Sequence, residues 1–191
     1  MGGWSRDDWF DRTGLPWVIP SPNMPTLDTA IVYPGAVLFE GTLLSEGGGA
    51  TRPFELVGAP WADGRAVAGR LEAHALPGVR FRPVRFEPTF QKHARASCGG
   101  VQIHVLDRDA FAPVLTAAAM LREFHAESPA AFAWRPPPYE YEHEKMPIDI
   151  LAGSPALRRQ VEAHEDPRAV AASWMPAVEA FEPARRTFLM Y

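Results

Sequence analysis

The chain has a single cysteine, Cys98, among its 191 residues, and this scarcity excludes two classes of protein. One thiol can form neither a disulfide framework nor a cysteine-rich zinc site. Cys98 lies in a Ser-Cys-Gly-Gly run at the entry of an expected strand, where a small buried hydrophobic residue is the usual interpretation. The six histidines show neither HxxxH nor HxH spacing. We therefore expect no metal site, since ligands would have to come from distant elements.

Clusters of positive charge and long apolar runs are missing as well. No basic run exceeds two residues and the net charge is −4, which argues against nucleic acid as a partner. No apolar run reaches the length of a membrane span, so no membrane partner is expected. The sequence contains neither a P-loop nor a GxGxxG motif after a strand, and we expect no cofactor. Its start, MGGWSRDDWF, is acidic and aromatic rather than typical of a signal peptide, which as written predicts a cytoplasmic location.

Proline, by contrast, is abundant, with 20 residues. This content predicts short elements joined by ordered loops rather than a helical bundle. The length suits one domain with a sizeable core. The order of apolar patterns predicts an α/β fold of the α+β type, in which helices pack on a small mixed β-sheet in a single domain.

Capping and periodicity signals predict where these elements lie. A helix is expected at 27–33, capped by Thr26 and ended by Pro34-Gly35. Four further helices are expected to begin near Asp63, near Asp107 or Asp109, near Ser154-Pro155 and near Asp166-Pro167. Strands are expected at 54–57, 79–87 and 99–106. Pro83 interrupts the second of these, which implies a bulge or an edge position.

The candidate binding loop is Ser45-Glu46-Gly47-Gly48-Gly49. Successive glycines can adopt positive φ and bring the backbone close to a ligand, and the preceding Ser-Glu pair supplies acceptors or an acid or base. On glycine content alone, a flexible surface hairpin is the favoured interpretation.

Other polar residues have similarly open roles. Glu40, Glu46 and Glu55 could act in pairs on a sugar, although Glu55 could instead form an ion pair with Arg52, three residues before it. Ser21 and Ser45 lack a GxSxG elbow, so a serine hydrolase has no support.

Loop and strand positions supply the remaining candidates. Asn23 lies between prolines in a loop, where its amide can donate and accept. Lys92 and His93 could bind an anion or remain solvated. His104 lies beside Gln102 on the polar face of a strand and is more often a satisfied histidine than a base.

A series of motifs in the order PSPNMPT, TAxxYPG, LFEGT, SEGxG and PFExxGAPW fills residues 20–61. Two further segments, LPGVRFRPVRFEPTFQKHARASCGGVQIHVLDR and FAWRPPPYEYEHEKMPIDILAGSPALR, follow. Together they resemble the exo-β-N-acetylmuramidase family from about Gly14 to the end of the chain. The resemblance implies a glycoside hydrolase that releases terminal N-acetylmuramic acid from peptidoglycan fragments (muropeptides) in bacterial cell wall turnover.

Members of that family are longer and are often exported, and they carry a Rossmann-like N-terminal domain followed by a smaller C-terminal one. The resemblance implies that residues 1–19 are a linking segment and that residues 20–191 are the C-terminal domain, which forms a cleft with an N-terminal domain in cis or in trans. The carboxylates proposed as catalytic belong to the N-terminal domain, so no catalytic residue is assigned in this chain. The substrate-binding residues implied are Ser21, Asn23, Glu40, Ser45, Glu46, Gly47, Gly49, Arg52 and Glu55, with Lys92, His93 and His104 as secondary candidates.

The sequence departs from the family pattern within the glycine loop. Leu43, Gly48 and Ala50 stand where the resemblance implies asparagine, arginine and threonine. The change at Gly48 removes a cation suited to a carboxylate, for which Arg52 could substitute. Three hypotheses follow: an incomplete muramidase that is inactive alone, a muropeptide- or partner-binding module, and a degenerate structural domain.

Overall fold

Three antiparallel strands, β1 (Leu56–Ala59), β2 (Val79–Phe86) and β3 (Cys98–Val105), form one sheet in the order β1–β3–β2. The computed structural model describes residue 3 and residues 5–190. The sequence predicted a mixed sheet, and in this respect the prediction was wrong. Residues 87–97 join β2 to β3 without a helix, and this favours an antiparallel return because a parallel neighbour usually needs a helical crossover.

The strand predictions otherwise match the structure closely. β2 is an edge strand, and Pro83 pairs with Val101 within an unbroken register. Of the two alternatives that Pro83 implied, the edge position is therefore confirmed and the bulge is absent. β3 is central, and its Val101 and Ile103 are buried in the core. β1 begins two residues later than expected, because Phe54 has φ = 63° and cannot continue a strand.

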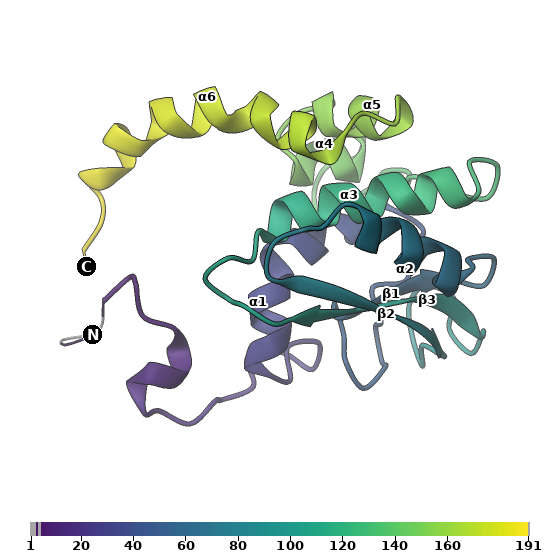
Figure 1. Ribbon diagram of the computed structural model, residues 1–191, viewed down its shortest axis with the longest axis horizontal. Helices are drawn as coiled ribbons and strands as arrows, with labels where there is room; N and C mark the ends of the chain where they lie inside the picture. The colour runs from purple at the N-terminus through teal and green to yellow at the C-terminus, as the bar shows by residue number, and fades with distance from the viewer. Residues whose placement is uncertain (1–2, 4, 191) are drawn as a thin grey trace.

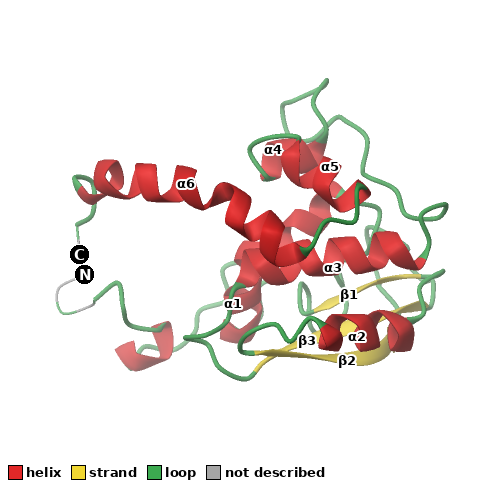
Figure 2. Cartoon of the chain, turned by 45° about the horizontal axis from the view of Figure 1, so that its top comes forward, coloured by secondary structure: helices red, strands yellow, loops and turns green. Residues whose placement is uncertain are grey.

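Helices are stacked on one side of this sheet, as Figures 1 and 2 show. Helix α2 packs on β2 and β3, α3 packs on α1 and α2, and α5 and α6 pack on α3. The predicted arrangement of helices on a small sheet in one domain is therefore confirmed. The helices and 3-10 helices are η1 (Phe10–Thr13), α1 (Leu27–Ala36), η2 (Val37–Gly41), α2 (Gly64–Ala73), α3 (Pro113–Glu127), α4 (Pro147–Leu151), α5 (Ala156–Glu162) and α6 (Pro167–Arg186).

Three predicted helix caps are confirmed by side-chain hydrogen bonds. The hydroxyl of Thr26 accepts from the backbone N–H of the third residue after it, at the start of α1. Asp63 and Asp166 each accept from two backbone N–H groups in the first turns of α2 and α6. Each bond satisfies a donor that the helix itself leaves free.

Several helix boundaries differ from prediction, and contacts in the structure explain two of them. α1 continues through Pro34 and Gly35 to Ala36, because its end is fixed by packing against α3: a Cβ on Gly35 would lie 2.0 Å from the carbonyl oxygen of Pro113. Asp107 accepts backbone hydrogen bonds only within a separate turn, and α3 begins at Pro113, a residue suited to the first helical position.

A close backbone contact sets α2 on the sheet. A Cβ on Gly64, the first residue of α2, would lie 2.2 Å from the carbonyl oxygen of Gly100 in β3. This approach lets Val67 and Leu71 reach the core, where neither has any exposed surface. The main hydrophobic cluster therefore lies between the sheet, α1, α2 and α3.

The first residues and α6 extend away from this core on the same side of the molecule (Figures 1 and 2). Residues 1, 2 and 4 of the expected linking segment lie outside the described residues. The indole N–H of Trp9 donates to Asp109 at 2.8 Å, and Arg108 pairs with Asp11 at 2.7 Å, so the segment contacts the loop before α3. Among the described residues, no helix combines the length and apolar character needed to cross a membrane.

Candidate ligand cavity

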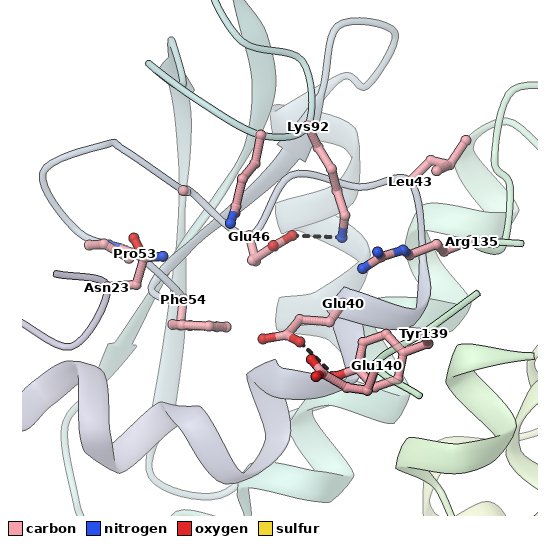
Figure 3. Close-up of a pocket in the computed structure, with 12 residues that line it drawn as sticks. Asn23, Glu40, Leu43, Glu46, Pro53, Phe54, Lys92, Arg135, Tyr139 and Glu140 are labelled. Carbon is pink, nitrogen blue, oxygen red and sulfur yellow. Dashed lines mark hydrogen bonds and ion pairs between the residues drawn. The ribbon is translucent and has the colours of Figure 1, made fainter. Parts of the chain in front are cut away.

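A cavity of about 560 Å³ lies beside the glycine loop, within the size range of small-molecule sites (Figure 3). Five segments of the chain form its wall: the turn that holds Asn23, the run from η2 to the glycine loop, the turn before β1, the loop at residues 91–92 and the loop at residues 135–140. The residues that line it are Asn23, Glu40, Leu43, Glu46, Gly48, Pro53, Phe54, Gln91, Lys92, Arg135, Tyr139 and Glu140.

The glycine loop is tied to the sheet rather than free. The backbone of Ser45 exchanges two hydrogen bonds with Gly58 of β1, at 2.8 and 3.0 Å, and its hydroxyl accepts from Gly47. Gly47 and Gly49 have φ of 76° and 72°, values that residues with a Cβ rarely adopt. The flexible-hairpin interpretation is therefore wrong. The glycines allow a tight turn that holds the side chain of Glu46 toward the cavity.

Lys92 neutralises Glu46 on the cavity wall. Its ammonium donates to Glu46 Oε2 and to the backbone carbonyl of Phe39, both at 2.8 Å. Only 15% of the Lys92 side chain and 9% of the Glu46 side chain are exposed. Burial lowers the pKa of Lys92, and the carboxylate of Glu46 opposes that shift. The pair can offer a ligand carboxylate oxygens and ammonium protons without a net charge.

Tyr139 and Glu40 form a second polar pair, on the opposite side of the cavity in Figure 3. The phenol donates to Glu40 Oε2 at 2.8 Å. Burial, together with the adjacent carboxylate of Glu40, raises the pKa of Tyr139. Burial and Glu40 also raise the pKa of Tyr33. Glu40 and Glu46 both line this cavity, with Glu46 directed toward Lys92 and Glu40 toward Tyr139 (Figure 3).

Aromatic and unpaired polar groups complete the wall. The ring of Phe54 is packed edge-on against Tyr33, with 4.9 Å between centroids. The side-chain oxygen of Asn23 is buried and has no hydrogen-bond partner among the described residues. Arg135 lies over the ring of Tyr139, with its guanidinium carbon 5.4 Å from the centroid. An apolar ring among convergent donors and acceptors is the combination that binds small polar ligands.

Backbone strain gathers at the same place. Seven described residues other than glycine have positive φ, and three of them, Phe54, Gln91 and Glu140, line the cavity. Such conformations cost free energy and persist where the surrounding structure fixes them, often at functional sites. The strain is independent support for a ligand site here.

The structure brings some of the predicted residues together and separates others. Asn23, Glu40, Glu46 and Lys92 line the cavity, and Ser45, Gly47 and Gly49 shape the loop beside it. The remaining candidates, Ser21, Arg52, Glu55, His93 and His104, do not line it.

Hydrogen bonds explain two of these separations. The hydroxyl of Ser21 accepts from the backbone N–H of Asn23, so Ser21 only shapes the turn. The ring of His93 contacts the backbone carbonyl of Leu43 at 2.7 Å. Both side chains are therefore engaged with the backbone of residues that line the cavity, and they do not line it themselves.

Arg52, Glu55 and His104 line a different and smaller cavity, of about 160 Å³. Arg52 lies 3.4 Å from Glu55 and 3.5 Å from Asp28, so the ion pair proposed for Glu55 is present. Glu55 also accepts from the hydroxyl of Thr29. Because its charge is shared by these carboxylates, Arg52 does not replace the missing cation of the glycine loop.

Sequence reasoning missed the segment that supplies Arg135, Tyr139 and Glu140. Their positions are about a hundred residues from Glu40, and no local pattern joins the two segments. The available signal was the FAWRPPPYEYE run, whose stiff prolines and dense aromatic and charged residues exceed what a connecting loop requires.

Cys98 and the histidines take no part in this cavity. Burial raises the pKa of Cys98 to about 11, as expected for an inert buried thiol. Among the residues that the structure describes, no group of three or more histidine, cysteine, aspartate or glutamate side chains is arranged to hold a metal ion.

Comparison with known proteins gives a consistent result. Residues 31–191 match the family model described as the C-terminal part of the exo-β-N-acetylmuramidase NamZ. The whole chain is 38% identical to the peptidoglycan β-N-acetylmuramidase NamZ of Bacillus subtilis and spans 44% of that relative's length.

Two solved structures from Bacteroides fragilis, both of DUF1343 family proteins, are similar to this chain. The first has a TM-score of 0.82 and 26% identity, over 99% of this chain and 49% of that protein. The second has a TM-score of 0.65 and 22% identity, over 91% of this chain and 43% of that protein, and supports the fold alone.

Proposed function

This chain belongs to the family of C-terminal parts of the exo-β-N-acetylmuramidase NamZ, and from that premise we propose that its cavity holds the terminal N-acetylmuramic acid of a peptidoglycan fragment. The whole protein would be a glycoside hydrolase that releases this sugar. The chain spans less than half of the curated relative, so we propose that hydrolysis requires an N-terminal part as well. Residues 1–19 would then join the two parts.

One observation carries this proposal: the cavity combines three carboxylates, two cations and two aromatic rings from segments that the fold has to bring together. A sugar offers hydroxyl and amide groups that such carboxylates can accept from, and an apolar ring face that Phe54 can contact. The lactyl ether of N-acetylmuramic acid adds a carboxylate, which the cations can receive.

Existing hydrogen bonds of Glu40 and Glu46 support separate roles for this chain and the N-terminal part, namely binding of the sugar and catalysis. Glycoside hydrolysis needs an acid that donates a proton to the leaving group and a second carboxylate that acts as base or nucleophile. Glu46 is held in an ion pair with Lys92, and Glu40 accepts the phenol proton of Tyr139. These groups suit positioning of the sugar, and the proton transfers are assigned to the N-terminal part.

A two-step experiment tests this function. Calorimetric titration of the purified chain with methyl N-acetyl-β-muramide should give saturable binding, and a 4-nitrophenyl N-acetyl-β-muramide should release no nitrophenol. Addition of the N-terminal part of the Bacillus subtilis relative as a separate polypeptide should then produce turnover. Absence of binding at millimolar sugar would reject the proposal. Turnover by this chain alone would reject the assignment of the proton transfers to the N-terminal part.

A non-catalytic binding module is the second candidate, and the same engaged carboxylates favour it. Such a module would bind the muramide with the same affinity and would remain inactive after addition of the N-terminal part. A degenerate domain would bind neither sugar nor partner. The outcomes of the experiment above therefore separate the three possibilities.

A further inference from the structure

The charges of the cavity leave one cation without an ion-pair partner. Glu46 pairs with Lys92 at 2.8 Å, and Glu40 accepts a hydrogen bond from Tyr139. The guanidinium of Arg135 has no hydrogen bond and no carboxylate within 4 Å among the described residues, including Glu140 on the same wall.

The position of Arg135 is fixed by its surroundings. Its backbone N–H donates to the carbonyl of Gly41 at 2.9 Å, which joins the loop to η2. Three prolines follow at 136–138 and restrict the backbone beyond it. The side chain extends over the ring of Tyr139, and Figure 3 shows it pointing into the cavity toward Glu40 and Lys92. A guanidinium held in this way loses little freedom when it binds a planar anion.

Gly48 leaves the cavity open where a side chain could otherwise stand. The atoms nearest to a Cβ there would belong to the end of the Gln91 side chain, at 2.7 Å, and to the ring of Phe90, at 3.7 Å. Gly48 therefore adds volume to the cavity and no charge. An anionic substituent of a ligand can enter, and the unpaired cation available to meet it is Arg135.

We propose that Arg135 is the specificity-determining residue of the cavity and that it receives the carboxylate of an acidic amino sugar through a bidentate, charge-assisted pair. The inference rests on the proposed function, because it names the part of the sugar that the cavity selects. It predicts a strong preference for N-acetylmuramic acid over neutral sugars of the same shape.

Lys92 and Arg52 are weaker candidates for the same role. Lys92 already donates to Glu46 and to the carbonyl of Phe39, so a ligand carboxylate would compete with an existing buried pair. Arg52 lies in the smaller cavity and is shared between Asp28 and Glu55. Arg135 needs to break no ion pair when the ligand binds.

The test compares two ligands that differ in one charge. Calorimetric titration with methyl N-acetyl-β-muramide and with its lactyl methyl ester should show that the wild-type chain binds the acid about 10- to 100-fold more tightly, the usual contribution of a hydrogen-bonded charge. In Arg135→Met, affinity for the acid should fall to that for the ester, which should itself change less than threefold. Arg135→Lys should keep part of the preference for the acid, because lysine keeps the positive charge but cannot donate the two parallel hydrogen bonds of a guanidinium.

The matched control is Arg159→Met, which removes an exposed arginine of α5 that does not line the cavity. It should leave the preference unchanged, and thermal unfolding should show that all variants are folded. If the wild-type chain binds both ligands equally, or Arg135→Met keeps the preference, the role of Arg135 is rejected while the sugar site stands. If neither ligand binds to the wild-type chain, the proposed function fails and this inference fails with it.

Discussion

The buried pair of Lys92 and Glu46 supports a quantitative prediction about stability. Lys92→Met removes the ammonium but keeps most of the apolar stem, so the change isolates the charge. The carboxylate of Glu46 then remains 91% buried with no cation at 2.8 Å, whereas the carbonyl of Phe39 keeps the backbone N–H and the hydroxyl of Thr42 as donors. Removing one partner of a buried pair costs about 3–5 kcal/mol.

The expected loss lies at or below the lower limit of that range. Glu46 faces a cavity that can admit water, which recovers part of its solvation. We therefore expect the free energy of unfolding to fall by about 2–3 kcal/mol, and Tm to fall by about 4–12 °C for a chain of this length. Urea unfolding at pH 7, followed by circular dichroism, gives both the midpoint and the slope.

Two further variants make this prediction refutable. Lys145→Met changes the chain's other lysine, which is exposed, and should alter the free energy of unfolding by less than about 0.5 kcal/mol. The double variant Lys92→Met with Glu46→Gln removes both charges and should recover to within about 1 kcal/mol of the wild type. A loss below about 1 kcal/mol for Lys92→Met, or no recovery in the double variant, would refute the reasoning.

Four other predictions follow from the geometry. The pKa of Tyr139 is higher in the folded chain than its ordinary value of 10.0. The stability that the phenol contributes is therefore fully present below pH 10.0 and is lost as the pH rises through the folded pKa. Tyr139→Phe should make the urea midpoint fall less steeply as the pH becomes alkaline. Gly49→Ala should destabilise by about 1–3 kcal/mol, because φ is +72° and the Cβ would lie 2.2 Å from the hydroxyl of Thr89. Gly69→Ala, in a helix with open space around it, should instead stabilise by about 0.5–1 kcal/mol in the same thermal melt, and equal effects would contradict both. Cys98, with its pKa raised to about 11, should react with a disulfide reagent at pH 8 only after unfolding, and rapid reaction of the native chain would contradict its burial.

Local signals were sufficient for much of the fold. The caps at Thr26, Asp63 and Asp166 depend on a side chain and the backbone two or three residues later, so the sequence contains the whole interaction. The strand predicted at 79–87 from alternation is present at Val79–Phe86, and its edge position is one of the two alternatives that Pro83 implied.

The errors came from tertiary contacts. Gly35 resembles a helix stop, but its missing side chain makes room for Pro113, which no local pattern reveals. The direction of each strand was likewise open, because it depends on how a loop returns the chain.

The candidate site was only partly predictable for the same reason. Glycine content identified the loop that carries Glu46, and Lys92 was a candidate as a loop cation, but their pairing spans 46 residues. The contact between Glu40 and Tyr139 spans 99 residues. Arg52 and Glu55 were close in sequence to the loop, yet a turn before β1 places them in the smaller cavity.

The most direct test of the central claim is an NMR titration of the chain with methyl N-acetyl-β-muramide. We expect saturable chemical-shift changes at the backbone amides of Gly48, Gln91 and Tyr139, which line the large cavity. Little change is expected at Gln102 and His104, which line the smaller cavity. No saturable shift at the first three residues, or shifts confined to the other two, would contradict the assignment of the large cavity as the sugar site.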